Sequence, residues 1–405
     1  MNDHFKIEQF RALFNSKNEF AVIDPRTAEE FESGHILAAS NLPLSTLKFS
    51  AQAQIPVFNS TIIICSDDPD LNHTAATVLE WIGYTDIHIL DEGFVGWRQS
   101  GGALFSGLNV PGKSFGEFVE HHCKTPTITV DDFLRRRENQ ESFLLLDART
   151  SEEHTSYCVP DSILCSATDM LYRVNVDRGD LIFVHCGGRT RSIIGAQTLV
   201  DAGFKNVSAF ENGTMAWQAK NLPLEGGNQK SLPALSQQNL LKNQKWLGLL
   251  ASRRDISRLS QVPESKKTLY LLDIRSKSEY DCGHIPGSVN APGGQLVQAV
   301  DCFILVRNAD VVLIDSDHIR ATTAAIWLSR MGITNIKVLS INNSHTLTTT
   351  HISEIEVHNT DRALNPNDYS DFALLLEQNR KYLEWEIALY EQMKGDPVAN
   401  LFSVD

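Results

Sequence analysis

The sequence lacks the features that mark exported, membrane-spanning and metal-binding proteins. No apolar run approaches the ~18 residues that a membrane-spanning helix needs. Residues 1–20 have neither a basic start nor an unbroken apolar centre, so we expect no secretory signal. The seven cysteines include no Cys-x-x-Cys pair, which argues against a zinc site and against a disulfide framework. We therefore expect a cytoplasmic protein in a reducing compartment, without a metal ion, a cofactor or a membrane contact.

Basic residues are also scarce. The chain carries 36 Lys and Arg against 50 Asp and Glu, a formal net charge of −14. Because phosphate backbones are held mainly by clustered basic residues, we expect no nucleic-acid partner. With 405 residues the chain is too long for one ordinary core and should divide into several domains.

What the sequence does contain is a threefold internal repeat. Each copy opens with an apolar strand that runs into Asp-x-Arg, at Asp24–Arg26, Asp147–Arg149 and Asp273–Arg275. A second apolar strand ends 41, 39 and 42 positions after these aspartates, at Cys65, Cys186 and Asp315. Apolar strands that alternate with helices are typical of parallel sheets covered on both faces. We therefore predict an α/β fold of three tandem domains, each an open, mainly parallel sheet with helices on both faces.

The repeat sets the expected domain boundaries, which are 1–107 (copy one), 129–226 (copy two) and 263–343 (copy three). Between them we expect a linker with a short helix at 108–128 and a second linker at 227–262. In the tail, 344–405, apolar residues recur near a spacing of 3.6 from Phe372 to Met393. This spacing predicts a C-terminal amphipathic helix that packs on the chain's own domains.

Copy two has the residues of an anion-binding loop around a nucleophile. Cys186 follows an apolar strand and precedes a helix, so backbone N–H groups and the helix dipole should favour thiolate over thiol. Arg189 and Arg191 add two positive charges, and Gly187 and Gly188 let the backbone curl around the sulfur. Such a loop suits attack on an electrophilic sulfur and stabilisation of the charged persulfide that results.

Three motifs together resemble the rhodanese superfamily. They are Asp-x-Arg, the loop Cys-x-x-x-x-Arg-Ser, and a closing Gly-x-x-x-Trp that ends copies one and two at Trp97 and Trp217. Further segments resemble the multidomain rhodanese-related sulfurtransferases, namely 105–111, 115–117, 188–197, 212–215, 291–298 and 382–386. Relatives of this kind carry four units, so the resemblance implies that a fourth unit is missing before the C-terminal helix.

The resemblance implies a rhodanese-type, thiosulfate sulfurtransferase-like activity. In that family the loop cysteine takes sulfane sulfur from thiosulfate, a persulfide or a polysulfide. It then passes the sulfur to cyanide, a thiol or a sulfur-carrier protein. Copies one and three are expected to be inactive, so the family's chemistry falls on copy two.

Carried onto copy two, the resemblance makes Cys186 the sulfur carrier. The residues around it that would hold substrate or stabilise its charged forms are Gly187, Gly188, Arg189, Thr190, Arg191 and Ser192. Arg189 is available to an anionic donor, and Arg173 stands where relatives place another donor-binding arginine. Asp147 and Arg149 are expected to brace the loop.

Copy two departs from the family pattern at one wall of this site. Where Gly-His-Ile-Pro-Gly is expected, the chain has Tyr157-Cys158-Val159-Pro160-Asp161. Cys158 and Cys165 are either thiols that resolve a persulfide or sulfenic acid on Cys186, or buried structural thiols. We favour the structural interpretation.

The corresponding loops of the other two copies are unsuitable for a nucleophilic thiolate. Cys65 is followed by Asp67, Asp68 and Pro69, so carboxylates crowd the sulfur and one N–H donor is missing. Copy three has Asp315 at the nucleophile position, which predicts an anion cradle without a sulfur acceptor.

Two other functions stay open. One is a non-catalytic, regulatory module that binds a persulfide or a sulfur-carrier protein. The other is a cysteine phosphatase or arsenate reductase, because His-Cys followed by Arg-Ser resembles the tyrosine-phosphatase signature. That signature has five residues between Cys and Arg, whereas Cys186 and Arg191 are separated by four. The shorter loop suits a single transferred sulfur better than a tetrahedral oxyanion.

Overall fold

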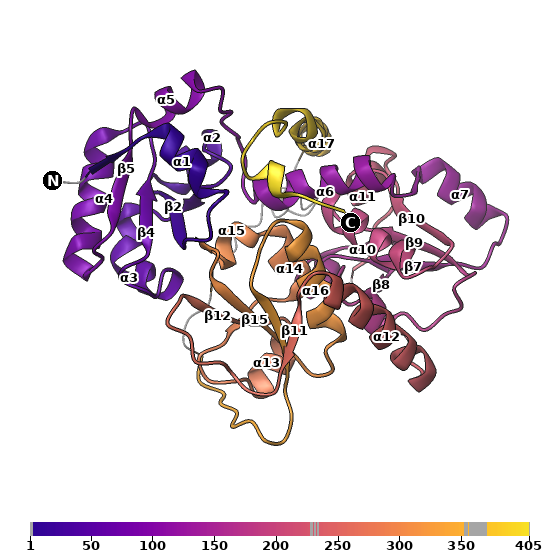
Figure 1. The fold of residues 1–405 in the computed structure, drawn as a ribbon. Coiled ribbons are helices and arrows are strands. Elements are labelled where there is room, and N and C mark those ends of the chain that lie inside the picture. Colours follow the sequence, from indigo (N-terminus) through magenta and orange to yellow (C-terminus); the bar gives the residue numbers. More distant parts are fainter. Residues whose placement is uncertain are drawn as a thin grey trace.

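Three β-sheets with the same strand order organise the chain. The computed structural model describes residues 3–226, 230, 232, 235–351, 355 and 371–404. In Figure 1 the three sheets appear in indigo to purple, in magenta, and in orange. The predicted α/β fold class, with three tandem and mainly parallel sheets, is confirmed.

Copy one has five strands of its own in the order β1-β5-β4-β2-β3, all paired in parallel. These strands are β1 (Asp3–Phe5), β2 (Phe20–Asp24), β3 (Ser40–Asn41), β4 (Thr61–Ile64) and β5 (Ile87–Leu90). The helices are α1 (Ile7–Leu13), α2 (Ala28–Ser33), α3 (Leu44–Gln54), α4 (Pro69–Ile82) and α5 (Gly93–Gln99). Every residue of β2 is buried, as expected for an apolar strand covered on both faces.

Copy two repeats this arrangement in the order β6-β10-β9-β7-β8. Its strands are β6 (Thr127–Ile128), β7 (Leu144–Asp147), β8 (Ile163–Leu164), β9 (Leu181–His185) and β10 (Asn206–Phe210). Its helices are α7 (Val130–Glu138), α8 (Ser151–Ser156), α9 (Met170–Arg173), α10 (Thr190–Asp201) and α11 (Gly213–Ala219). The central strands β7 and β9 pair in parallel with Asp147 opposite His185, which brings the Asp-x-Arg motif beside the Cys186 turn.

Copy three has the order β11-β16-β15-β12-β13. Its strands are β11 (Ser257–Leu259), β12 (Leu269–Asp273), β13 (Val289–Asn290), β15 (Asp310–Asp315) and β16 (Ile336–Ser340). Its helices are α12 (Gln237–Arg253), α13 (Lys277–Cys282), α14 (Gly293–Gln298), α15 (Val300–Phe303) and α16 (Ile319–Arg330).

The two segments expected as linkers contain structured elements. The first forms α6 (Val110–Cys123), a helix whose residues 110–117 are buried without a break. Gly112 lets α6 approach α14, because a Cβ there would stand 2.0 Å from the carbonyl oxygen of Gln298. The second contains α12 and the edge strand β11, so the sheet of copy three begins before the predicted boundary. The described parts of both segments belong to the packed structure.

Copy three also contributes a strand to the sheet of copy one. β14 (Val306–Arg307) pairs antiparallel with β2, with Val306 opposite Ala21. The Tyr270 hydroxyl donates to the carbonyl oxygen of Gln54 at 2.6 Å. Copies one and three are therefore joined by hydrogen bonds as well as by the chain.

The predicted C-terminal helix is present as α17 (Phe372–Gln392), which contacts α6 (Figure 1). Its buried face contains Asn379 and Glu386 beside leucines, whereas Phe372 and Ile387 are each 44% exposed. The buried face is therefore more polar than the predicted apolar stripe. After α17 the chain makes one short turn, η3 (Ala399–Leu401). No helix in the described part of the chain is both long and apolar enough to span a membrane.

Candidate active site

An aspartate–arginine pair stands at the same strand end in all three copies. In copy two, Arg149 Nη2 lies 2.8 Å from Asp147 Oδ2, and both side chains are fully buried. The Arg149 guanidinium also donates to the carbonyl oxygen of Tyr157, which ties the strand end to the next turn. Equivalent bonds join Arg26 to Asp24 and Gly34, and Arg275 to Asp273 and Gly283. Because the pair occurs with and without a neighbouring cysteine, we interpret Asp147 and Arg149 as a brace.

Cys186 occupies the turn between β9 and α10. Its thiol donates a hydrogen bond to Ser192 Oγ at 3.4 Å, and its carbonyl oxygen accepts one from Thr214 N at 2.8 Å. Gly213 makes this turn possible, since its φ is +50° and a Cβ would stand 2.3 Å from the Cys186 carbonyl oxygen. The glycine of the Gly-x-x-x-Trp motif therefore allows α11 to pack against the Cys186 turn.

Burial changes the expected ionisation of Cys186. The residue is 2% exposed, and loss of hydration raises the pKa of its thiol above the ordinary value. The Arg191 charge and hydrogen bonding to Ser192 lower the pKa, as the sequence predicts, but the Glu386 carboxylate adds to the rise. Burial thus opposes the ionisation that the loop was predicted to favour, while the Arg191 charge and Ser192 support it.

Two imidazoles lie beside Asp147. His154 Nδ1 is 2.9 Å and His185 Nε2 is 3.9 Å from Asp147 Oδ2. Burial lowers the pKa of His185 to about 4. Burial also opposes protonation of His154, but hydrogen bonding to Asp147 and Cys158 outweighs it and raises the pKa to about 9. The equivalent positions in the other copies hold Phe31, Ile64, Tyr280 and Ile314, so this cluster belongs to copy two alone.

Arg189, predicted to be available to an anionic donor, has carboxylate partners in the structure. Its guanidinium pairs with Glu117 at 2.6 Å and with Glu120, both on α6, and donates to Asn212 at 3.2 Å. Burial raises the pKa of Glu117 to about 7, although the Arg189 charge opposes this. The Arg189 charge is thus already matched by carboxylates, which the structure places on the segment expected to be a linker.

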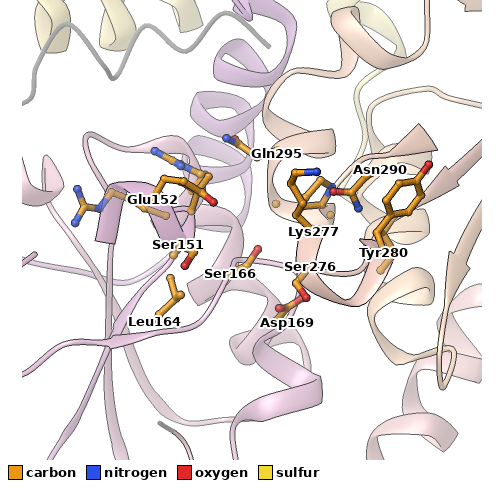
Figure 2. Close-up of a pocket in the computed structure, with 18 of the residues that line it drawn as sticks. Ser151, Glu152, Leu164, Ser166, Asp169, Ser276, Lys277, Tyr280, Asn290 and Gln295 are labelled. Atoms are coloured by element: carbon orange, nitrogen blue, oxygen red, sulfur yellow. The ribbon is translucent and has the colours of Figure 1, made fainter. Parts of the chain in front are cut away.

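Arg191 and Arg173 are brought to one cavity, together with Arg149. Arg191 pairs with Glu153 through both terminal nitrogens, at 2.5 and 2.8 Å. The three arginines line a cavity of about 460 Å³ between copies two and three. Figure 2 shows this cavity with other residues that line it, such as Ser151 and Asn290. The predicted site is therefore divided, because Arg191 and Arg173 face this cavity while Arg189 faces α6.

Glu386 of α17 is a neighbour of the loop that sequence reasoning missed. Thr190 Oγ1 donates to Glu386 Oε1 at 2.8 Å, and Glu386 is 1% exposed. A Cβ at Gly188 would stand 2.9 Å from Glu386 Oε2, so this glycine lets the carboxylate lie against the loop. Glu386 Oε2 has no hydrogen-bond partner among the described residues. The only sequence signal for Glu386 was the resemblance of residues 382–386 to relatives, which does not show that Glu386 lies beside the Cys186 loop.

The remaining candidate cysteines are buried. Cys65, Cys158 and Cys165 are each fully buried, and all seven cysteines are free. Burial raises the pKa of the Cys65 thiol well above its ordinary value, and the Asp24 carboxylate raises it further. These observations favour structural roles for the three thiols.

The equivalent turn of copy three has backbone N–H groups that can bind an anion, and the Asp315 side chain of the same turn accepts their hydrogen bonds. The Asp315 carboxylate accepts hydrogen bonds from the backbone N–H groups of Ser316, Arg320 and Ala321 at 2.6, 2.9 and 3.2 Å. Arg320 Nε also donates to it at 2.9 Å. No thiol is present at this turn.

Comparison with known proteins covers most of the chain. The family model of the Rhodanese-like domain matches residues 6–100, 129–220 and 255–341. The structure is similar to the crystal structure of a thiosulfate sulfurtransferase from Pseudomonas aeruginosa, with a TM-score of 0.88 and 27% identity over 100% of both chains.

Two proteins of Bacillus subtilis are similar in sequence. A proposed sulfur carrier protein, YrkF, is 26% identical over 148 residues, which are 33% of this chain and 80% of the relative. The uncharacterized protein YqhL is 37% identical over 90 residues, which are 22% of this chain and 68% of the relative.

Proposed function

Because the chain belongs to the rhodanese-like domain family, we propose that it is a sulfurtransferase in which Cys186 alone carries the transferred sulfur. The observation that supports this assignment is the difference between three equivalent turns. The turn of copy two holds a thiol with Ser192 and the Arg191 charge beside it. The turn of copy one holds a thiol next to the Asp24 carboxylate, and that of copy three holds a carboxylate.

The proposed reaction is two successive transfers of a neutral sulfur atom. With thiosulfate as donor, the Cys186 thiolate attacks the outer sulfur, the S–S bond of thiosulfate breaks, and sulfite leaves with the electron pair. An acceptor thiolate or cyanide then attacks the outer sulfur of the Cys186 persulfide and restores the Cys186 thiolate. No net oxidant or reductant is consumed.

Ser192 is proposed to change its hydrogen bonding during this cycle. In the resting state its hydroxyl accepts from the Cys186 thiol and donates to the carbonyl oxygen of Arg189 at 2.8 Å. Once the thiol loses its proton, the Ser192 hydroxyl can donate to the sulfur instead. Charge-assisted hydrogen bonds are stronger than neutral ones, so this change stabilises the thiolate and the persulfide.

The acceptor is proposed to be a small thiol, cyanide or a sulfur-carrier protein. Similarity to a proposed sulfur carrier protein supports the last of these. The contrasting hypothesis, a module that binds a persulfide without turnover, predicts loading of Cys186 without release to any acceptor.

Intact-mass spectrometry tests the assignment directly. After incubation with thiosulfate, cysteine persulfide, polysulfide or mercaptopyruvate, the loaded protein should gain about 32 Da, one sulfur atom, mapped to Cys186. Cys186→Ser should remove this gain, and the matched variant Cys65→Ser should keep it. Equal loss in both variants would contradict the single-site proposal, and loading that no acceptor removes would favour the binding module.

A further inference from the structure

A second cavity, of about 250 Å³, lies where copy three joins copy one. Three parts of the chain form its walls, namely residues 14–17 and Phe20 of copy one, residues of the segments 304–311 and 332–334 of copy three, and Leu401 of η3. Among the described residues, none of copy two lines it, so this cavity is separate from the proposed sulfur site. Its volume is below the roughly 300–1,000 Å³ of drug-sized sites, which suits a small ligand.

Contacts on two sides fix the walls of this cavity. The side-chain amide of Asn308 donates to the carbonyl oxygens of Ser16 and Asn18 at 3.2 and 2.8 Å, which holds the loop after α1. Gly332 lets η3 come close, because its φ is +84° and a Cβ there would stand 2.5 Å from the Leu401 Cβ. A ligand would therefore meet a largely preformed site at the junction of two copies and the C-terminal turn.

Arg307 of β14 brings a positive charge without an ion pair to this cavity. Among the described residues, the half-buried Arg307 has no hydrogen-bond acceptor and no carboxylate within 4 Å for its guanidinium. The guanidinium carbon lies 5.4 Å from the centroid of the Phe14 ring. Loss of hydration lowers the pKa of Arg307 to about 10, although the Asp396 charge opposes the fall.

Asp396 compensates the Arg307 charge only from a distance. Its Oδ1 atom accepts a hydrogen bond from Val398 N at 2.8 Å, and the residue does not line the cavity. A charge removed from water is unfavourable unless hydrogen bonds or an opposite charge compensate it. The N–H groups of Arg307 are therefore available to an acceptor that enters the cavity.

The other lining residues suit an anion with an apolar part. Among the described residues, no Asp or Glu lines the cavity, and the exposed Lys17 adds a second positive charge. The apolar part of the lining includes Phe14, Phe20, Ile333 and Leu401. An arginine can bind a carboxylate through two parallel N–H bonds, so one carboxylate could supply the acceptor that Arg307 lacks.

We propose that this cavity binds a small organic monocarboxylate, with its carboxylate at Arg307 and its apolar part against Phe14, Phe20 and Leu401. The carboxylate accepts hydrogen bonds from the guanidinium, and the apolar part removes aromatic and aliphatic surface from water. Inorganic phosphate would match the charge but leave that surface uncovered. Because the walls come from two copies and from η3, the bound carboxylate stabilises their junction.

Isothermal titration of the full chain with benzoate, benzamide and inorganic phosphate tests the inference. Benzamide has the shape of benzoate without its charge, so benzoate should bind at least ~10-fold more tightly. Benzoate should also bind more tightly than phosphate, which has no apolar part. Equal affinities for benzoate and benzamide, or no binding of benzoate, would overturn the proposal. Phosphate that binds as tightly as benzoate would overturn the proposed class of ligand.

Substitutions of Arg307 test where benzoate binds. Arg307→Gln should weaken benzoate binding at least ~10-fold and remove the preference over benzamide. Arg307→Lys keeps the charge but loses the paired N–H groups, so its affinity should lie between those of the wild type and Arg307→Gln. Arg258→Gln, which alters an exposed arginine of β11 in the same copy, is the matched control and should bind benzoate like the wild type.

Thermal unfolding gives a second measurement. A ligand that binds only the folded state stabilises it, so benzoate should raise the unfolding midpoint of the wild type and of Arg258→Gln, but not that of Arg307→Gln. Benzoate that binds to and stabilises Arg307→Gln as it does the wild type would show that it binds elsewhere. The comparison of benzoate with benzamide in the wild-type chain decides the proposal even if Arg307→Gln does not fold.

Discussion

Copies two and three build the same turn around different side chains. In both, an arginine in the first turn of the following helix pairs through two nitrogens with a glutamate from a helix capping box. These pairs are Arg191 with Glu153 and Arg320 with Glu279. Copy two places the buried Cys186 thiol at the turn, whereas copy three places a carboxylate that accepts three backbone N–H bonds.

This difference indicates which chemical species the turn is built to hold. The carboxylate oxygens of Asp315 are one bond farther from the backbone than a cysteine sulfur would be. Counted in bonds from the backbone, they correspond to the outer sulfur of a persulfide at the same position. If Cys186 carries sulfur as proposed, the equivalent turn of copy two would favour the charged, sulfur-loaded form over the thiol.

The largest expected effect is the loss of sulfur loading when Cys186 is replaced by the aspartate that copy three has at the equivalent position. Cys186→Asp should reduce sulfur loading by at least ~10³-fold, since no nucleophilic sulfur remains. Its free energy of unfolding in urea should nevertheless equal or exceed that of Cys186→Asn, because an aspartate charge can be stabilised by the loop N–H groups. If Cys186→Asp unfolds at lower urea than Cys186→Asn, the two turns are not equivalent.

The ionisation of Cys186 should produce the next largest effect. Since burial raises the pKa of this thiol, the thiolate fraction should keep rising with pH across the whole interval from about pH 7 to about pH 9. Alkylation of Cys186 by iodoacetamide, followed by peptide mass mapping, should accelerate about 10-fold per pH unit. The exposed Cys282 provides an internal reference. A rate that levels off near neutrality would show that the thiol is not held protonated.

Removal of the carboxylate from copy three should cost stability. Asp315→Ala leaves three N–H groups, two of them buried, without their charged acceptor, so the free energy of unfolding should fall by about 2–3 kcal/mol. Urea denaturation measures this change. Glu264→Ala, which alters an exposed carboxylate of the same copy, is the control. An equal, small effect in both variants would mean that Asp315 does not stabilise its turn.

The smallest expected effect is a change in the rate of sulfur loading caused by a substitution in α17. Glu386→Gln removes the negative charge that helps raise the pKa of Cys186 but keeps an oxygen to accept from Thr190. Sulfur loading near neutral pH should increase about threefold, because a lower pKa gives more thiolate. Glu384→Gln, on an exposed part of the same helix, should have no such effect. Slower loading in Glu386→Gln would show that the carboxylate assists the reaction.

The repeated fold was predictable because its signals are local. Buried strands such as β2, β7 and β12 are short apolar runs that end in the same Asp-x-Arg motif. The edge strand β11 has two exposed residues of three and gives no such signal. A short helix was expected in the segment that forms α6, but its burial was not, because its glycines and polar residues are typical of a linker although they serve close packing.

The proximity of site residues was predictable for those that are neighbours in sequence. Cys186, Arg191 and Ser192 lie on one turn, so their spacing indicates their proximity. The partners of Arg189 and Thr190 lie 72 and 196 positions away, at Glu117 and Glu386. Spacing along the chain cannot reveal such contacts, and it cannot show that Cys186 is buried.

The pairing of β14 with β2 has a consequence for biosynthesis. The first sheet completes its edge with residues that leave the ribosome only after the whole of copy two has been made. A nascent chain therefore carries an open strand edge, a known template for intermolecular pairing, until Val306 and Arg307 arrive. Truncation before residue 306 should consequently yield a first sheet with a free edge and a greater tendency to aggregate than the full-length protein.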